Sequence, residues 1–456
     1  MKNVVILALN AKFVHSAHAA WILAESIPKF AKFPHNVTVA ECTINQPNEE
    51  IVAAVLARNP DVVGVSTYIW NAAKLPEILR LLRESLPNAT FILGGHEATH
   101  NAEYWLNCGA DFIIKGEGER TFPTLLDSIY NSESPAQIVE SEPLTEFSNP
   151  QSDEYFASLE HKLGYIETSR GCPFQCAFCL SAGTNVRFMP LEQACAQIER
   201  LSKSGIRTMK FVDRTFNCNA ARAFEIFEFV INLNTQVCFH FEVAADLFDE
   251  RTLKLLATAP IGRIQFEAGL QSFHQPTLDA SSRRTDTELA ERNIRALVEL
   301  GNIHLHVDLI AGLPLETLPN LMDSFDLAYN LGAEHLQLGF LKLLHGSRLR
   351  TEYNGVIQHS ELPPYEISSS PWLSANELKI IKFAENALNR TRNKGRFLPA
   401  LEYVLNVSKL RPFELYRALG EAVPNHGMPL TEYTQRVFEF FLTLPNIDSD
   451  ELKNKF

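Results

Sequence analysis

Short apolar runs alternate with longer amphipathic stretches through the N-terminal part of the chain. Val4–Leu9 and Val62–Ser66 have the pattern of buried strands, and Ser16–Phe30 and Leu75–Leu86 have the pattern of helices. The same alternation continues through Asn36–Glu41, Glu49–Arg58, Thr90–Leu93, Glu103–Leu106, Phe112–Ile114 and Thr121–Tyr130. Strand–helix alternation repeated five times predicts a doubly wound parallel sheet, on which ligands bind beyond the carboxyl ends of the strands.

A second alternation begins at Leu163 and has six candidate strands. They are Tyr165–Thr168, Thr208–Val212, Val237–Val243, Arg263–Ala268, His304–Ile310 and His335–Leu341. Six strand–helix units predict a partial (β/α)6 barrel of the TIM type, open where a full barrel would close. Catalytic groups of such barrels lie at the carboxyl ends of the strands, so residues near those ends are the first candidates for chemistry.

Two further segments complete the chain. Residues 131–160 are rich in Ser, Pro and Glu and lack periodicity, which indicates a linker. After Gly346 the pattern becomes helical, as in Ala375–Leu388, Phe397–Asn406 and Leu430–Leu442. We therefore expect an α/β chain with a doubly wound domain at residues 1–135, a linker at 136–162, the partial barrel at 163–345 and a mainly helical domain at 346–456.

Composition and charge narrow the classes of partner. The chain has 456 residues, of which 46% are hydrophobic and 21% are charged, as in ordinary globular proteins. No apolar run is long enough to cross a bilayer, so we expect a cytoplasmic protein without membrane contact. The net charge of −13 argues against general attraction to nucleic acid. The basic run Arg390–Arg396 is typical of a solvated helix end, and contact with transfer RNA or a ribosomal component is the alternative.

Three of the eight cysteines form a pattern that points to metal chemistry. The other five stand alone among apolar neighbours and are typical of buried thiols in a reducing compartment: Cys42, Cys108, Cys195, Cys218 and Cys238. Cys172, Cys176 and Cys179 form C-x-x-x-C-x-x-C after the first barrel strand. Three thiolates at this spacing can bind three irons of a 4Fe–4S cluster and leave the fourth iron open to a small molecule. The alternative is a zinc knuckle, but zinc prefers four protein ligands and no fourth Cys or His is close in sequence.

The cysteine loop, with Phe178 directly before the third cysteine, resembles the signature of radical S-adenosylmethionine (SAM) enzymes. Lys210–Asn217, Glu267–Ser272 and Asp308–Thr317 support the resemblance. It implies a catalytic 4Fe–4S cluster held by the three cysteines, with SAM bound at the open iron. It also implies that the cluster reduces SAM and produces a 5′-deoxyadenosyl radical, which removes hydrogen from an unactivated carbon.

The same resemblance implies cofactor contacts for further residues, namely Phe178, Asp213, Thr215, Glu242, Gln271, Arg283, Asp308 and Gly312. Arg283 is expected at the methionine carboxylate, Asp308 at the ribose hydroxyls and Gly312 beside the adenine. Asp213-Arg214-Thr215 stands where the family usually has a glycine-rich motif, so Asp213 would accept a hydrogen bond from the methionine ammonium. As alternatives, Arg283 is a surface charge and Gln271 a hydrogen-bonding residue at a strand end.

Three segments of the N-terminal domain, Val65–Asn71, Ile92–Glu97 and Gly116–Glu119, resemble flavodoxin-like cobalamin-binding domains. The resemblance implies cobalamin contacts from Asn10, His15, Ser66, Tyr68, Trp70, Asn71, Gly94, Gly95, Gly116, Glu117 and Gly118. The D-x-H-x-x-G segment that supplies an axial histidine in many such domains is absent, and Asn10–His15 occupies that loop. We therefore expect no imidazole from that motif on cobalt. The alternative is a domain kept as a scaffold without cobalamin.

The resemblance to radical SAM enzymes with this domain implies cobalamin-dependent methyl transfer to an unactivated carbon of a small molecule or peptide. Radical rearrangement, cyclisation or another C–H functionalisation without methyl transfer is an alternative, and so is a non-catalytic cobalamin or iron–sulfur sensor. An external electron donor such as flavodoxin or ferredoxin would reduce the cluster. The C-terminal region resembles an uncharacterised domain found behind this pair, and the sequence does not identify the substrate.

Overall fold

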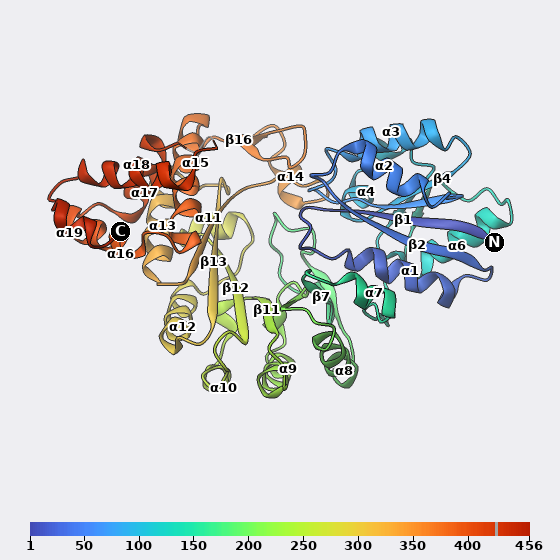
Figure 1. The fold of residues 1–456 in the computed structure, drawn as a ribbon, viewed down its shortest axis with the longest axis horizontal. Helices are drawn as coiled ribbons and strands as arrows, with labels where there is room; N and C mark the ends of the chain where they lie inside the picture. The colour runs from blue at the N-terminus through green and yellow to red at the C-terminus, as the bar shows by residue number, and fades with distance from the viewer. Residues whose placement is uncertain (425–426) are drawn as a thin grey trace.

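The N-terminal domain is built on a six-stranded parallel sheet in the order β2-β1-β3-β4-β5-β6 (Figure 1). The computed structural model describes residues 1–424 and 427–456 of the chain. The strands are β1 (Lys2–Asn10), β2 (His35–Thr43), β3 (Val62–Ser66), β4 (Thr90–Gly94), β5 (Phe112–Lys115) and β6 (Ile138–Glu140). The helices are α1 (His18–Phe30), α2 (Asn48–Leu56), α3 (Leu75–Ser85), α4 (His96–His100), α5 (Ala102–Asn107) and α6 (Gly118–Tyr130). The predicted doubly wound sheet is confirmed.

The central strand β1 shows why this sheet leaves only its ends free for a ligand. Val5 and Leu7 pack into the core on the α2 and α3 side of the sheet. Val4 and Ile6 pack into a second core, with side chains of α1 and α6. A strand buried on both faces is typical of a parallel sheet covered by helices on each side. Polar groups that serve a ligand must therefore come from the loops that follow the strands.

The central domain is a second six-stranded parallel sheet, in the order β14-β13-β12-β11-β10-β7. Its strands are β7 (Gly164–Ile166), β10 (Thr208–Phe211), β11 (Cys238–Val243), β12 (Ile264–Gln271), β13 (His304–Ala311) and β14 (His335–Phe340). The helices are α8 (Leu191–Ser202), α9 (Ala220–Asn232), α10 (Glu250–Leu256), α11 (Gln275–Ala280), α12 (Thr287–Leu300) and α13 (Leu318–Asn330). All six predicted strands are present, and the partial barrel is confirmed.

Each long barrel strand has one apolar and one polar face. On β12, Ile264 and Phe266 are fully buried in the core between the sheet and its helices, whereas Gln265 and Glu267 alternate with them and are only partly buried. Because side chains of a strand point alternately to opposite faces, the polar residues gather on the inner side of the barrel. The inner side is therefore the place where the barrel can carry chemistry.

Residues 131–160, expected to lack periodic structure, contain two short elements. Strand β6 pairs in parallel with β5, with Ile113 opposite Ile138, and helix α7 (Asp153–Ser158) follows. A strand of three residues is too short to show periodicity, which explains why the sequence pattern missed it. After β7, an antiparallel hairpin of β8 (Ser169–Cys172) and β9 (Thr184–Phe188) encloses the cysteine loop.

The C-terminal region is mainly helical, as predicted, and packs on the barrel (Figure 1). Its elements are α14 (Arg348–Glu352), β15 (Gln358–His359), β16 (Ile367–Ser369), α15 (Ala375–Arg390), α16 (Leu398–Ser408), α17 (Pro412–Ala422), α18 (Leu430–Leu442) and α19 (Ser449–Lys453). One contact ties this region to the N-terminal domain: the Tyr365 hydroxyl donates to Glu97 Oε2 at 2.9 Å. Within residues 1–424 and 427–456, no helix is long and apolar enough to span a membrane.

The basic run Arg390–Arg396 serves packing within this region. The guanidinium carbon of Arg390 lies 3.8 Å from the centre of the Tyr433 ring, and that of Arg392 lies 4.5 Å from the centre of the Tyr329 ring. Arg392 also donates to the carbonyl oxygen of Ala333 at 2.6 Å. These contacts connect helices of the C-terminal region with the barrel and leave fewer charges free for nucleic acid.

Candidate cofactor site between the two sheets

The cysteine loop is held rigidly by the hairpin around it. Gly171 has φ of +97°, and a Cβ atom there would lie 2.3 Å from the carbonyl oxygen of Asn185, so only glycine fits this close approach of β8 to β9. The backbone N–H of Cys172 donates to Thr184 Oγ1 at 3.0 Å. The N–H of Gly183 donates to the carbonyl oxygen of Phe174 at 2.7 Å and closes the loop. The three thiols are therefore presented from a fixed backbone.

The donor set suits a cluster better than a single metal ion. Cys172, Cys176 and Cys179 are free of disulfide bonds and partly or fully buried. Burial and the neighbouring Cys176 and Cys172 thiols raise the pKa of Cys179, although a hydrogen bond from Ser181 and the charge of Arg214 oppose this. Within the described part of the chain, no three His, Cys, Asp or Glu side chains converge as ligands of one ion. In a 4Fe–4S cluster the thiolates bind different irons and are spread accordingly, so the residues fit the cluster and not zinc.

Five of the residues expected at SAM line one cavity at the carboxyl ends of β10 to β13: Thr215, Glu242, Gln271, Arg283 and Asp308. Arg214, Glu267 and Gly269 complete its polar wall. Two contacts join this cavity to the cysteine loop. Thr215 Oγ1 lies 3.6 Å from Cys172 Sγ, and the Arg283 guanidinium lies 3.7 Å from Cys176 Sγ. The structure thus brings the cysteine loop and these five residues together.

Three carboxyl groups line the cavity, those of Glu242, Glu267 and Asp308. Burial raises the pKa of Glu242 to about 7, against the charge of Arg214. Burial and the neighbouring Glu267 carboxylate also raise the pKa of Asp308 well above its usual range. Glu267 itself has a lowered pKa because the His240 ring donates to it, with 3.1 Å between Nε2 and Oε2. Asp308 Oδ1 is buried and, among the described residues, has no hydrogen-bond partner. A buried acceptor without a partner fits a ligand that brings hydroxyl groups, as the ribose of SAM does.

Arg283 and Gln271 are fixed by the backbone around them. Arg283 donates to the carbonyl oxygen of Gly269 at 2.6 Å and to Thr285 Oγ1 at 3.0 Å, which aims its guanidinium along the cavity wall. Gln271 has φ of +71°, and its side chain folds over Gly269, where a Cβ atom would lie 2.3 Å from Gln271 Nε2. Left-handed backbone at a non-glycine residue costs energy and is common at functional sites. Arg283 is therefore a part of the cavity and not a free surface charge.

Two of the expected SAM contacts lie elsewhere. The Asp213 carboxylate is buried and is used by the hairpin: it accepts from the Thr168 N–H at 2.9 Å, from the Thr168 hydroxyl at 2.7 Å and from the Ser169 hydroxyl at 2.7 Å. It therefore anchors the start of β8 and does not face an ammonium in the cavity. Gly312 is covered by the C-terminal region, since a Cβ atom there would lie 2.8 Å from Ile367 Cδ1. Phe178 is half-buried against the barrel core, beside the third cysteine.

The ends of the first sheet carry an aromatic pair that suits a large flat ligand. Tyr68 and Trp70 stack with ring centres 4.4 Å apart and an angle of 10° between their planes. The Trp70 indole donates to the carbonyl oxygen of Leu9 at 3.0 Å, yet the side chain remains 44% exposed. Gly95 has φ of +99° and lets β4 pass close to Thr67, where a Cβ atom would lie 2.5 Å from the backbone oxygen. The anchored, exposed stack fits the face of a corrin ring, and an indole has no free lone pair for cobalt.

Several other residues expected at cobalamin are engaged with protein groups. The Asn71 amide is fully buried and donates to Ser66 O at 3.0 Å. Asn10 donates to the His15 carbonyl oxygen at 2.9 Å, and His15 Nδ1 lies 2.6 Å from the Tyr165 hydroxyl of β7. These residues shape the strand-end loops and join them to the barrel. Gly94, Gly116 and Gly118 lie at the ends of β4 and β5 and at the start of α6.

Glu117 is not free for a ligand either. Its carboxylate pairs with Arg170 NH1 at 2.8 Å and with the Arg187 guanidinium. Both arginines belong to the hairpin that encloses the cysteine loop. Glu117 thus joins the first domain to the hairpin of the barrel, and its expected role in cobalamin binding stays a prediction.

Sequence reasoning missed three charged residues of the cavity. Arg214 and Glu267 line it, and Lys210 acts electrostatically on Glu242, Glu267 and Asp308. Each belongs to a segment already singled out as typical of the family, but none was expected at the cofactors. For Lys210 and Glu267 the signal was a charged residue at an inward position of a barrel strand, whereas Arg214 lies in the loop after β10 and gave no such signal.

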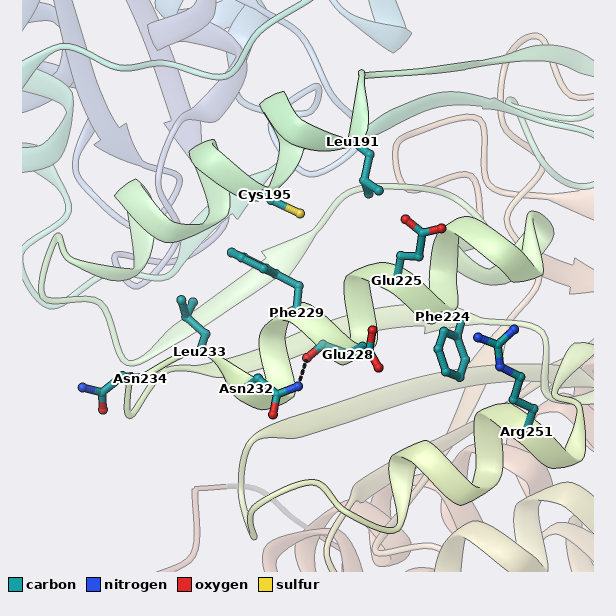
Figure 2. A pocket seen from close by; sticks show the side chains of 10 residues that line it. All are labelled: Leu191, Cys195, Phe224, Glu225, Glu228, Phe229, Asn232, Leu233, Asn234 and Arg251. Atoms are coloured by element: carbon teal, nitrogen blue, oxygen red, sulfur yellow. Dashed lines mark hydrogen bonds between the residues drawn. The ribbon is translucent and has the colours of Figure 1, made fainter.

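A second groove lies on the outer side of the barrel, between α8, α9 and α10 (Figure 2). Its lining consists of Leu191, Cys195, Phe224, Glu225, Glu228, Phe229, Asn232, Leu233, Asn234 and Arg251. It includes none of the residues expected at a cofactor, and it lies on the helices and not at the strand ends. The inner cavity is therefore the candidate site.

Comparisons with known proteins agree with this arrangement. Residues 4–126 match the B12 binding domain family, residues 166–328 match the radical SAM superfamily, and residues 352–446 match a family described as a protein of unknown function, DUF4080. The chain therefore carries a B12-binding domain at residues 4–126 and a radical SAM domain at residues 166–328. Its cofactors are accordingly a 4Fe–4S cluster, SAM and cobalamin.

Relatives and solved structures extend the comparison. The chain is 22% identical to an uncharacterized methyltransferase of Pyrococcus horikoshii, over 69% of this chain and 74% of that protein. It is 21% identical to the cobalamin-dependent radical SAM methyltransferase TokK of Streptomyces tokunonensis, over 88% of this chain and 64% of that protein. The solved structure of the cobalamin-dependent SAM radical enzyme OxsB with aqua-cobalamin and SAM covers 100% of this chain with a TM-score of 0.68. The identity is 14% and 78% of that chain is covered, so this likeness concerns the fold.

Proposed function

We propose that this chain is a cobalamin-dependent radical SAM methyltransferase that acts on an unactivated carbon. The observation that supports the proposal most is that the cysteine loop borders the carboxyl-rich cavity, while the aromatic stack of the first sheet lies within the electrostatic reach of a residue of that cavity. This residue is Arg214, because it lines the cavity and its charge acts on the pKa of both Tyr68 and His96 at the ends of the first sheet. Cofactors on the two sheets would therefore be close to each other.

The residues of this chain would bind and orient the cofactors. When bound, the cluster and SAM supply a 5′-deoxyadenosyl radical, and cobalamin supplies the methyl group. Asp308 would accept from the ribose hydroxyls through Oδ1, which has no hydrogen-bond partner in residues 1–424 and 427–456, and Arg283 would pair with the methionine carboxylate. Gln271 and Glu242 remain candidates for the polar ends of SAM. The ordered hairpin and the packed Phe178 would keep water away from the cysteines.

The partners follow from this chemistry. A small molecule or a peptide is the proposed substrate, and an external donor such as flavodoxin or ferredoxin would supply the electron. Three free thiols at the cluster site suit a reducing compartment, so we place the protein in the cytoplasm. We expect no binding of nucleic acid through the basic run, because Arg390 and Arg392 pack against Tyr433 and Tyr329.

Anaerobic reconstitution with hydroxocobalamin, followed by desalting, tests the proposal. Near-stoichiometric corrinoid together with iron is the expected result, with S-adenosylhomocysteine formed from SAM in the presence of a strong reductant. Protein that cleaves SAM normally but retains no corrinoid would contradict methyl transfer and favour radical chemistry without it. Protein that holds both cofactors but leaves SAM intact would favour a sensor.

A further inference from the structure

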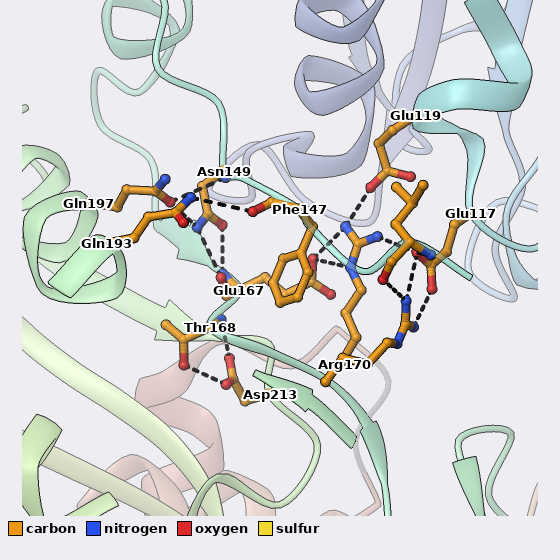
Figure 3. Close-up of polar contacts among 12 residues, drawn as sticks. Glu117, Glu119, Phe147, Asn149, Glu167, Thr168, Arg170, Gln193, Gln197 and Asp213 are labelled. Carbon is orange, nitrogen blue, oxygen red and sulfur yellow. Dashed lines mark hydrogen bonds and ion pairs between the residues drawn. The ribbon is translucent and has the colours of Figure 1, made fainter. Parts of the chain in front are cut away.

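A buried cluster of charges joins the N-terminal domain to the hairpin of the cysteine loop (Figure 3). Arg170, on β8, pairs with Glu117 at 2.8 Å, with Glu167 at 2.8 Å and with Glu119. Arg187, on β9, pairs with the same Glu117 carboxylate. The two arginines stand opposite each other in the hairpin, so both reach the turn that follows β5.

The cluster is too buried to be an ordinary surface ion pair. The side chains of Arg170, Glu119 and Glu117 are only 10%, 13% and 21% exposed. The Phe147 ring covers Arg170, with 4.7 Å between the guanidinium carbon and the ring centre. The Leu144 N–H donates to Glu117 Oε2 at 3.0 Å. Removing one partner of such a pair leaves a buried charge uncompensated, so these contacts fix geometry more strictly than exposed pairs do.

The hairpin is thereby held from two sides. On the barrel side, Thr168 and Ser169 donate to Asp213, as Figure 3 shows for Thr168. On the other side, Arg170 and Arg187 pair with the turn at Glu117 and Glu119. The backbone passes directly from Arg170 through Gly171 to Cys172, the first cysteine of the loop. A displacement of the turn would therefore shift the N-terminal domain relative to the hairpin and Cys172, while the bonds to Asp213 keep the hairpin on the barrel.

We propose that Arg170 and Glu117 are positioning residues that set the placement of the cluster relative to cobalamin. Both side chains are engaged with protein partners, so each would act through the hairpin and not by contact with a cofactor. The inference rests on the proposed function, since it requires both cofactors in one chain. Its consequence is selective: reductive cleavage of SAM needs the barrel and the cluster alone, whereas methylation of the corrinoid needs the two domains in register.

Two reactions without substrate separate these steps. In the first, one electron from dithionite through the cluster breaks the sulfur–carbon bond of SAM and gives methionine and a 5′-deoxyadenosyl radical. That radical takes a hydrogen atom from a C–H group of the buffer and becomes 5′-deoxyadenosine. In the second, the methyl group of SAM passes to cobalt of cob(I)alamin, which supplies both electrons of the new bond. The sulfur keeps the electron pair of the broken bond, and S-adenosylhomocysteine leaves.

The test compares the full chain, reconstituted with iron, sulfide and hydroxocobalamin, with its Glu117→Gln and Arg170→Lys variants. Glutamine keeps the shape of Glu117 without its charge, and lysine keeps the charge of Arg170 without the planar group that serves three carboxylates. The matched control is Glu77→Gln, which removes an exposed pair with Arg80 on α3. Iron and corrinoid contents are measured first, and wild-type protein without corrinoid would refute the proposed function itself.

The readouts are the two SAM products and the dipolar interaction between cob(II)alamin and the reduced cluster in pulsed electron paramagnetic resonance. Both variants are expected to keep iron and corrinoid and to show a broader distribution of distances between cobalt and the cluster. They should form S-adenosylhomocysteine roughly ten to a hundred times more slowly, because small misplacements of reacting groups have effects of that size. The expected change in 5′-deoxyadenosine formation is less than about threefold, since the barrel is intact. Narrow distances and unchanged product ratios in Glu117→Gln would overturn the inference while the proposed function stands. Loss of corrinoid alone from Glu117→Gln would also overturn it, because Glu117 would then serve cobalamin directly.

Discussion

Replacement of Asp308 by Asn removes the charge of the one carboxylate in the cavity whose Oδ1 is buried and, in the described part of the chain, unpartnered. The side chain keeps its size, so the barrel core on the other face of β13 is not disturbed. A hydrogen bond to an ionised acceptor contributes about 1.5 to 3 kcal/mol, which corresponds to roughly ten to a hundred times weaker SAM binding in the variant near pH 9, where the free wild-type group is ionised. The cluster content should not change, because Asp308 does not bind iron in this account.

The affinity for SAM should depend on pH in a direction that the raised pKa of Asp308 determines. Burial raises the pKa of Asp308 to about 8, so near neutral pH the free protein holds the group mainly protonated. A ligand that needs the carboxylate pays for its ionisation below that pKa and binds more tightly as the pH rises. Between pH 7 and pH 9 the wild-type affinity for SAM should increase about tenfold, since one pKa unit corresponds to about 1.4 kcal/mol. The Asp308→Asn variant lacks the group and should not show this increase.

Equilibrium binding of SAM to the cluster-reconstituted protein, measured anaerobically at several pH values, provides the assay. Any titration of SAM itself affects wild type and variant equally, so the difference between the two slopes isolates Asp308. Asp450→Asn, in the exposed helix α19, serves as the control for the substitution. Equal affinities, or equal slopes with pH, in folded proteins of equal iron content would refute the reasoning.

Three further changes test separate parts of the account. Cys176→Ala should lose the cluster but keep the circular dichroism of the fold, and full iron content in this variant would remove Cys176 from the ligand set. Glu316→Gln should stabilise the protein at pH 8 but not at pH 5. Burial raises the pKa of Glu316 to about 8 from its ordinary 4.5. The wild-type protein therefore loses stability as the pH rises between these values, by about 3 kcal/mol at pH 7. Thermal unfolding at the two pH values measures this effect, and a melting temperature raised equally at both would contradict it. Trp70→Ala should weaken the retention of hydroxocobalamin about tenfold without loss of iron, because it removes the exposed half of the aromatic stack; unchanged retention would take the stack out of the corrin site.

The strand pattern of the barrel could be predicted because the longer strands alternate apolar and polar side chains between turns. Strand β6 could not, since Ile138–Glu140 is short and is stabilised only by pairing with β5. The cysteine loop could be predicted directly, because the spacing of its three cysteines is typical of a loop that binds a 4Fe–4S cluster. The placement of Gly312 under Ile367 depends on how the C-terminal region folds back on the barrel, and no local pattern encodes that contact.

The polar residues show the same division. Glu242, Asp308 and Glu267 lie on inward positions of neighbouring strands, so the alternation of strand side chains could have placed all three together. Asp213 and Glu117 are different, because the side chains that they contact lie 44 residues or more away in sequence. The local sequence around a carboxylate at a strand end does not show whether the carboxylate faces a ligand or an arginine. Only the folded chain tells the two apart.

Formation of 5′-deoxyadenosine from SAM tests the central claim most directly. Anaerobically purified protein with about four irons per chain, given dithionite and SAM, should produce 5′-deoxyadenosine and methionine in equal amounts. The variant with Cys172, Cys176 and Cys179 all replaced by Ala should produce neither. Wild-type protein that carries the full cluster and binds SAM, yet forms no 5′-deoxyadenosine, would contradict the account.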